Sequence, residues 1–168
     1  MIADALSLML FPALMALAAS SDLLTMTISN RVSLILAGGF FGVAAAGGMG
    51  GFDVLMHLVA GAAVLVAGFI CFARGWMGGG DAKLAAATAL WFGFDHLCDY
   101  LIYASLFGGA LTLLLIQFRM IPLPQVLAAQ TWVQRLHQKG GGVPYGIALA
   151  AAALIVYPDT IWMKAIVM

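Results

Sequence analysis

The chain has 168 residues, of which 64% are hydrophobic and only 8% charged, and its mean hydropathy is +1.08. A soluble domain does not need so much apolar surface, so the composition predicts an all-α, polytopic integral membrane protein. Seven basic and seven acidic residues give a net charge of zero. The chain therefore lacks the basic surface that is typical of nucleic-acid-binding proteins.

Six apolar runs are candidates for transmembrane helices, because about 20 apolar residues cross the hydrocarbon core. The predicted spans are residues 2–20, 32–49, 54–73, 84–94, 100–118 and 143–157. The only charge near the start is Asp4, whereas a secretory signal carries positive charge before its apolar core, so we expect a retained first span. Residues 1–168 are predicted to form one membrane domain, with the tail Ile161–Met168 in the interface.

The charged residues segregate between the connections that join these spans. The first, third and fifth connections contain six of the seven basic residues. The termini and the other connections contain five of the seven aspartates and only one lysine, Lys164. Because Lys and Arg accumulate in cytoplasmic loops, both termini are predicted to lie outside and the odd connections inside.

The fifth connection, Arg119–Gly142, is the only long one. Its Ile121-Pro122-Leu123-Pro124 run stops any helix that continues from the fifth span. Apolar residues then recur at roughly helical spacing between polar ones, which predicts an interfacial segment over residues 125–138 on the inner membrane surface. A solvated linker is the alternative.

Two carboxylates, Asp22 and Asp81, remain on the predicted cytoplasmic side. Asp22 follows the first span and Asp81 precedes the fourth, so two crossings separate them and they share one membrane face. Asp81 stands in a Gly78-Gly79-Gly80-Asp81 run, where the glycines allow unusual backbone conformations and close approach. A carboxylate at a membrane edge is a functional candidate, although Asp81 at a helix start is also ordinary capping chemistry.

Two adjacent aspartates can hydrolyse a peptide bond without a metal ion. Like charges that lie close together cannot both ionise, so the pair holds one proton between them. The ionised partner takes a proton from the attacking water, and the protonated partner polarises the carbonyl oxygen.

The histidines offer no convincing alternative chemistry. His57 and His96 are predicted to lie toward the outer face, and His137 lies in the long connection. No histidine is predicted to lie close enough to Asp22 to complete a metal site or to activate a serine nucleophile beside it. We therefore expect no metal and no cofactor.

Three motifs along the chain resemble those of type IV prepilin peptidases in their short form. The first follows the family's Asp…Ile-Pro-Asn pattern, the second its Gly-x-Gly-Asp-x-Lys pattern, and the third is a proline-centred motif at the last span. The matching positions are Asp22, Ile28 and Asn30; Gly78, Gly80, Asp81 and Lys83; and Pro144-Tyr145-Gly146. The three motifs fall in family order, and the resemblance covers the whole chain.

The chain also departs from the family pattern. Ser29 stands where proline is usual, and Met26-Thr27 replace the expected basic residues. The zinc-type cysteine clusters of the longer relatives are missing. The resemblance therefore leaves open whether the chain also methylates its product with S-adenosylmethionine.

The resemblance implies an aspartic endopeptidase of the bacterial inner membrane that removes the short basic leader of prepilin-like precursors, after a glycine, at the cytoplasmic face. It implies Asp22 and Asp81 as catalytic residues. It implies supporting or substrate-binding roles for Asn30, Gly78, Gly80, Lys83 and Pro144. For Lys83 its position favours an inner-face anchor, which could also meet lipid phosphate, over the site role. The implied partners are the precursor and membrane lipid.

Two other functions stay open from the sequence. A presenilin-like protease shares Gly-x-Gly-Asp but cuts within a transmembrane helix. A small transporter or assembly subunit would use the aspartates for ions or protons. The sequence predicts neither the particular pilin nor the oligomeric state, because Gly and Ala faces pack within one chain as readily as between chains.

Overall fold

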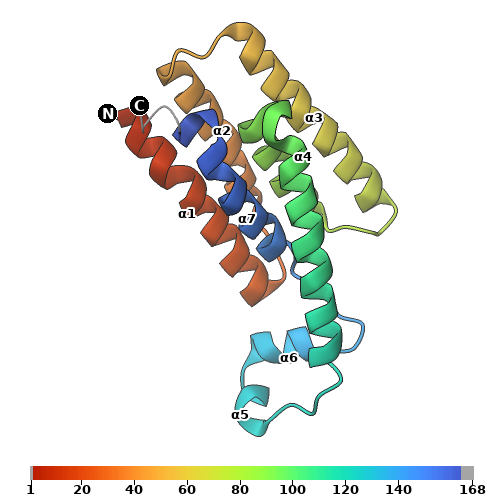
Figure 1. The fold of residues 1–168 in the computed structure, drawn as a ribbon. Helices are drawn as coiled ribbons and strands as arrows, with labels where there is room; N and C mark the ends of the chain where they lie inside the picture. Colours follow the sequence, from red (N-terminus) through yellow and green to blue (C-terminus); the bar gives the residue numbers. More distant parts are fainter. Residues whose placement is uncertain (1, 164–168) are drawn as a thin grey trace.

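The computed structural model describes residues 2–163, with side chains from residue 9 onward. Within this range every regular element is a helix (Figure 1). The elements are α1 (Ile2–Thr25), α2 (Asn30–Ala46), α3 (Gly51–Ala73), α4 (Gly79–Phe118), α5 (Gln125–Ala128), α6 (Thr131–His137), α7 (Tyr145–Val156) and the 3-10 helix η1 (Tyr157–Asp159). The all-α prediction is confirmed for this part of the chain. Lys164 and most of the predicted interfacial tail lie outside the described residues.

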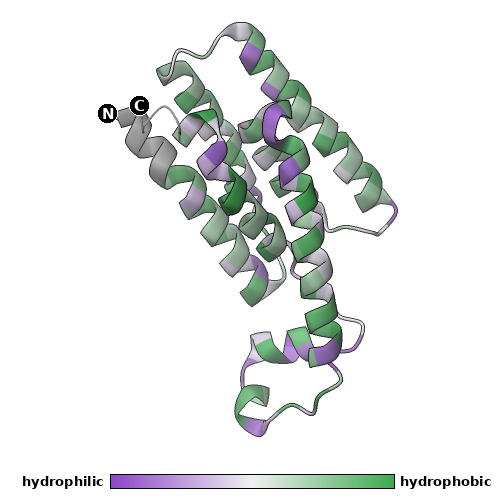
Figure 2. Cartoon of the chain, viewed as in Figure 1, coloured by the Kyte–Doolittle hydropathy of each residue, from purple (hydrophilic) through white to green (hydrophobic). Residues whose placement is uncertain are grey.

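Two of these helices, α3 and α4, are long and apolar enough to cross a membrane by length and composition. Three shorter apolar helices of 10–17 residues accompany them, at Met9–Thr25, Asn30–Ala46 and Tyr145–Asp159. Apolar residues cover the helical bundle, whereas polar ones gather at its ends and around α5 and α6 (Figure 2). On α3 even large apolar side chains are exposed, such as Val66 at 61% and Phe69 at 64%. These features fit a membrane protein, while the number of six spans stays a prediction.

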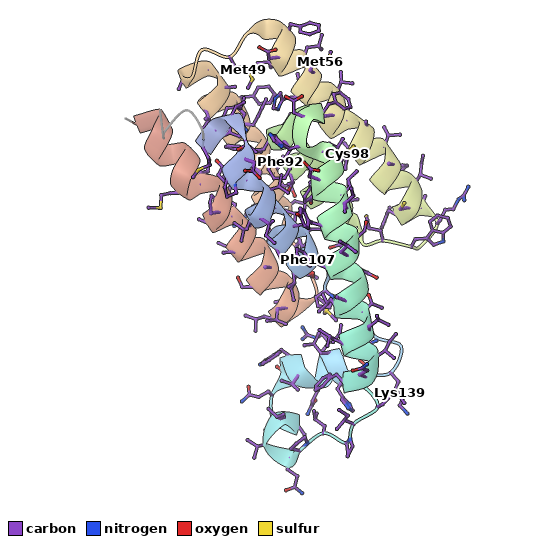
Figure 3. All side chains as sticks on the ribbon, in the orientation of Figure 1. Met49, Met56, Phe92, Cys98, Phe107 and Lys139 are labelled. Atoms are coloured by element: carbon purple, nitrogen blue, oxygen red, sulfur yellow. The ribbon has the colours of Figure 1, made fainter. Side chains whose placement is uncertain are left out.

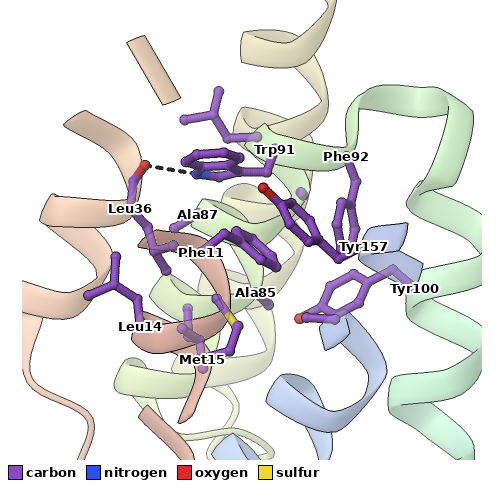
Figure 4. Packing of buried hydrophobic residues seen from close by; sticks show 14 of the residues in the cluster. Phe11, Leu14, Met15, Leu36, Ala85, Ala87, Trp91, Phe92, Tyr100 and Tyr157 are labelled. Atoms are coloured by element: carbon purple, nitrogen blue, oxygen red, sulfur yellow. Dashed lines mark hydrogen bonds between the residues drawn. The ribbon is translucent and has the colours of Figure 1, made fainter. Parts of the chain in front are cut away.

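The predicted break between the fourth and fifth spans lies earlier than expected. Residues 95–99 connect the predicted spans 84–94 and 100–118, but they are helical within α4. The break is instead a kink at Gly93, whose φ of 59° and ψ of −166° are not helical. Phe92 and Tyr100 consequently bring their ring centroids to 5.3 Å, although eight residues of straight helix would rise about 12 Å. The chain changes direction sharply at this point (Figures 1 and 4).

Side chains from two other segments satisfy carbonyl groups at the kink. His57 Nδ1 lies 2.7 Å from the Leu90 carbonyl oxygen, and because a carbonyl only accepts, Nδ1 carries the proton. Trp162 Nε1 donates to the Trp91 carbonyl oxygen at 2.6 Å. Buried backbone carbonyls need such partners, so these two bonds stabilise the bent form of α4.

The core lies between α1, α2, α4 and α7 and contains a cluster of aromatic rings among smaller apolar side chains (Figure 4). Phe11 stacks on Tyr157 with ring centroids 4.3 Å apart, and it also contacts Trp91 at 5.2 Å. The indole N–H of Trp91 donates to the Leu36 carbonyl at 2.8 Å, so this buried polar group is satisfied. The helix α7 packs against both α1 and α4, which places it at the centre of the bundle.

The long connection is more ordered than a solvated linker. The predicted interfacial segment 125–138 forms the two short helices α5 and α6 rather than a single helix. Val126 is 81% exposed, but Val133 and Leu136 are buried. Figure 3 places Lys139, which follows α6, at the opposite end of the molecule from Met49 and Met56.

Two arginines fasten this connection to the bundle. Arg119, at the end of α4, donates to the carbonyl oxygens of Leu136 and Gly142 at 2.8 and 2.7 Å. Arg135, on α6, donates to the Leu24 carbonyl oxygen in the last turn of α1 at 2.9 Å. The segment that leads into α7 is therefore tied to both α1 and α4.

We expect Gly93→Ala to lower the melting temperature of the detergent-solubilised protein by several degrees. A Cβ at Gly93 would lie 2.9 Å from the His57 ring, and a φ of +59° strains any L side chain, at a cost of about 1–3 kcal/mol. The matched control is Gly109→Ala in the same helix, where a Cβ meets no atom within 4 Å; it should leave the melting temperature equal or slightly higher. Equal effects of the two substitutions would contradict a structural role for the kink.

Candidate active site

Asp22 lies in the last turn of α1 and is 5% exposed. Its Oδ2 accepts a hydrogen bond from the backbone N–H of Gly146 at 2.7 Å. Gly146 is the second residue of α7, so the carboxylate sits at a helix N-terminus, where free N–H groups and the helix dipole favour negative charge. A Cβ on Gly146 would come within 2.8 Å of Oδ2, so this approach requires glycine.

Asp81 lies in the first turn of α4 and is 9% exposed. The backbone N–H of Gly78, the N-cap residue of α4, donates to its carboxylate. This contact is the capping interaction that the sequence offered as the alternative role for Asp81. The Asp22 carboxylate lies close enough for its charge to act on Asp81. Capping and catalysis are therefore compatible, because one N–H leaves most of the carboxylate's acceptor capacity unused.

Ile28 connects the surroundings of the two aspartates. A Cβ built on Gly80 would lie 3.2 Å from the Ile28 Cβ and 3.5 Å from its backbone nitrogen and oxygen. A Cβ on Gly146 would lie 2.8 Å from Ile28 Cδ1. The loop between α1 and α2 thus packs against the backbone of α4 on one side and of α7 on the other. Ile28 therefore lies close to Gly80, the neighbour of Asp81, and to Gly146, the hydrogen-bond partner of Asp22.

The loop itself is fixed by local hydrogen bonds. The Met26 N–H donates to the Asp22 carbonyl oxygen at 2.8 Å, and the Ser21 hydroxyl donates to the Thr27 carbonyl oxygen at 2.8 Å. Met26 has a φ of 56°, a conformation that costs a non-glycine residue free energy. These contacts define the loop although Ser29 replaces the family's proline. Ser29 instead caps α2 by accepting from the Arg31 N–H at 3.3 Å.

Both aspartates lie just outside the predicted membrane-spanning segments 2–20 and 84–94. Burial, and after it the nearby Asp22 carboxylate, raises the pKa of Asp81 to about 7, against the opposing effect of the Gly78 N–H. Burial also raises the pKa of Asp22, against the opposing effect of the Gly146 N–H. Near neutral pH this environment favours a pair that keeps a proton.

The other residues singled out in the sequence fall into two groups. Gly78 and Gly80 adjoin Asp81, and the fully buried Pro144 is the N-cap residue of α7, two residues before Gly146. Lys83 Nζ donates to Asn30 Oδ1 at 2.9 Å, which ties the start of α2 to the first turn of α4. This pair lies on another side of α4, because two residues of helix turn the side chain by about 200° from Asp81.

The sequence did not assign a role to Gly146, although it stands in the third motif, Pro144-Tyr145-Gly146. The only signal was a glycine directly after the predicted helix start, which is too common to single out. Beside it, the Tyr145 hydroxyl lies 3.1 Å from the Thr112 hydroxyl. Within residues 2–163, no three His, Cys, Asp or Glu side chains are grouped so that they could hold a metal ion.

The fold and this site describe an all-helical protein of membrane character with two buried carboxylates from separate helices, α1 and α4. The type IV leader peptidase family matches residues 9–113, which is more than half of the chain and includes Asp22 and Asp81. The chain belongs to this family and is a peptidase of the prepilin leader peptidase type, as its motifs indicate. Comparisons with curated proteins and with solved structures gave no match.

We expect Asp81→Asn to stabilise the protein at pH 8 and to have little effect at pH 5. With a pKa of about 7 in the folded state and about 3.9 when unfolded, the folded protein holds a proton at pH 5 that the unfolded chain has lost. Stability therefore falls as the pH rises toward 7, where a buried charge forms. Asn carries no charge at either pH.

The measurement is the melting temperature of wild type and variant from pH 5 to 8.5. The exposed Asp99 in the same helix supplies the control Asp99→Asn, which should follow the wild-type pH dependence. Parallel curves for wild type and Asp81→Asn would contradict the buried environment of this carboxyl.

Proposed function

We propose that the chain is an aspartic endopeptidase that cuts prepilin-like precursors with Asp22 and Asp81. The observation that carries this proposal is the convergence of the two buried carboxylates, one bonded to the N-terminus of α7 and the other with a pKa raised to about 7 by burial and by its neighbour. A pair that retains one proton supplies an acid and a base at the same pH.

The environments of the two carboxylates suggest separate roles. Asp22 accepts the Gly146 N–H at a helix N-terminus, which favours its ionised form and makes it the base. Asp81, whose pKa burial and the Asp22 charge raise to about 7, holds the proton and donates a hydrogen bond to the carbonyl oxygen of the scissile peptide. Because the groups interact, the apparent pKa values of the reaction belong to the pair.

The reaction needs only water and the two carboxyl groups. Asp22 removes a proton from the water as its oxygen bonds to the peptide carbon, and the Asp81 proton passes to the carbonyl oxygen. When this tetrahedral intermediate collapses, the C–N bond breaks and the leaving amine takes the proton from Asp22. The hydroxyl proton returns to Asp81, so the pair ends as it began.

The membrane topology that we propose would let a leader peptide reach these two carboxylates. We propose six spans within a single domain, residues 1–168, in the bacterial inner membrane, with the termini outside and the aspartates at the cytoplasmic face. A short basic leader then meets the aspartates while the following apolar helix remains in the membrane. Gly78 and Gly80 have no side chain to obstruct an approaching substrate backbone, and Lys83 with Asn30 fixes the adjacent helix ends.

We expect Asp22→Asn and Asp81→Asn each to lower leader removal by at least about 100-fold, because each leaves the reaction without its base or its acid. The assay is co-expression with a small pilin-like precursor, scored by the mass of the product. Asp99→Asn serves as the control, and membrane insertion of each variant is checked by fractionation. Full cleavage by either variant would exclude the aspartate pair.

The position of the cut separates the two protease functions that the sequence left open. A leader peptidase should produce a single new N-terminus directly after a glycine that precedes the apolar helix. A presenilin-like protease would instead cut inside that helix. The mass of the released peptide distinguishes these outcomes.

We also expect Gly146→Ala to lower kcat by about 10- to 100-fold, because the added methyl group displaces Asp22 and a shift of about 1 Å in a catalytic group has effects of this size. The control Gly142→Ala lies just before α7 and places its Cβ where no atom lies within 4 Å. Measured on the same precursor, the control should keep wild-type kcat. An unchanged kcat in Gly146→Ala would show that the Gly146–Asp22 contact does not position the base.

A further inference from the structure

An apolar groove of about 540 Å³ lies between α2, α3 and α4 and takes no part in the proposed reaction. Each helix lines it over two turns with the spacing i, i+3, i+4 and i+7. On α4 these residues are Lys83, Ala86, Ala87 and Leu90, and the equivalent stripes run from Asn30 to Ala37 on α2 and from Leu58 to Leu65 on α3. Helix α3 stands at the margin of the bundle (Figure 1). The groove therefore runs along the three helices and is lined mainly by apolar side chains.

One end of this groove carries a cation without an anionic partner. Lys83 Nζ donates to the neutral Asn30 Oδ1 at 2.9 Å, and the described part of the chain gives this ammonium group no other partner. An ammonium group has three N–H donors, so two remain available. This end of α4 is also the end that carries Asp81, beside the predicted membrane surface. A phosphate at that surface would complement the charge of Lys83.

The direction of the groove argues against the peptide substrate as its occupant. Lys83 projects about 200° around α4 from Asp81, so the groove opens on the side away from the aspartate pair. The Ile28 backbone, which packs against Gly80 next to Asp81, is not part of the groove lining. A peptide in the groove is thus kept from the catalytic carboxylates, whereas a lipid has no need to reach them.

We propose that this groove binds an anionic phospholipid from the leaflet nearest the aspartate pair, with its phosphate on Lys83 and an acyl chain along the Ala-rich floor. The small side chains Ala86 and Ala87 let the chain lie close to the helix backbone. The proposal is independent of the catalytic roles of Asp22 and Asp81.

The first test measures binding of phosphatidylglycerol and of phosphatidylcholine to the detergent-solubilised full chain by native mass spectrometry. We expect phosphatidylglycerol to bind more tightly than phosphatidylcholine. Lys83→Gln should weaken phosphatidylglycerol binding about tenfold, as the loss of a hydrogen bond between charged groups predicts. Lys83→Arg should retain this binding. The control Arg74→Gln removes an exposed cation at the adjacent end of α3 and should keep wild-type binding. Equal binding of both lipids, or equal losses in Lys83→Gln and Arg74→Gln, would overturn the proposal.

The second test fills the groove. Ala62 lines it, whereas the neighbouring exposed Ala63 does not, so Ala62→Phe should weaken phosphatidylglycerol binding about tenfold if an acyl chain is displaced, and Ala63→Phe should not. Unchanged lipid binding in Ala62→Phe would overturn the proposal. So would a raised KM for precursor cleavage in that variant with lipid binding intact, because the groove would then hold the substrate's helix.

Discussion

The hydrogen bond from the Gly146 N–H to the Asp22 carboxylate is the contact on which the arrangement of the site depends. A buried carboxylate is expensive unless backbone or side-chain donors replace its water. At 2.7 Å this N–H supplies such a donor, and it comes from α7, which packs against both α1 and α4. The position of α7 therefore decides where Asp22 lies relative to Asp81. A residue with any side chain at position 146 would push the carboxylate away.

The kink at Gly93 fixes the path of α4 at the other end of the bundle. It divides a 40-residue helix into two arms, so that the first arm packs within the core while the second continues to Arg119. Trp91, at the kink, donates to α2 and accepts from Trp162. The aromatic cluster around this tryptophan thus packs in the apolar core, and its indole N–H groups also satisfy backbone carbonyl groups near the bend. The first turn of α4, with Asp81, is held in place by this packing.

The sequence predicted much of this arrangement, and the failures have physical causes. The helical content followed from composition. That Asp22 and Asp81 share one membrane face follows from counting the predicted crossings and stays a prediction. The predicted spans 84–94 and 100–118 left residues 95–99 as a connection, but the break occurs at Gly93, where a φ of +59° and the His57 ring 2.9 Å from a Cβ together favour glycine. Gly146 was overlooked because its role depends on a contact across 124 residues, which no local pattern reveals.

The two arginine clamps on the long connection have a practical consequence. Residues 119–142 look like a dispensable linker by composition, yet Arg119 and Arg135 bind main-chain oxygens of Gly142 and Leu24, next to the start of α7 and the end of α1. Shortening this stretch, or inserting a fluorescent reporter there, would displace the start of α7. The Gly146 N–H that binds Asp22, the proposed base, would move with it. The loop Gly47–Gly50 at the far end carries no such ties to the catalytic groups, so it is the better place to attach a label.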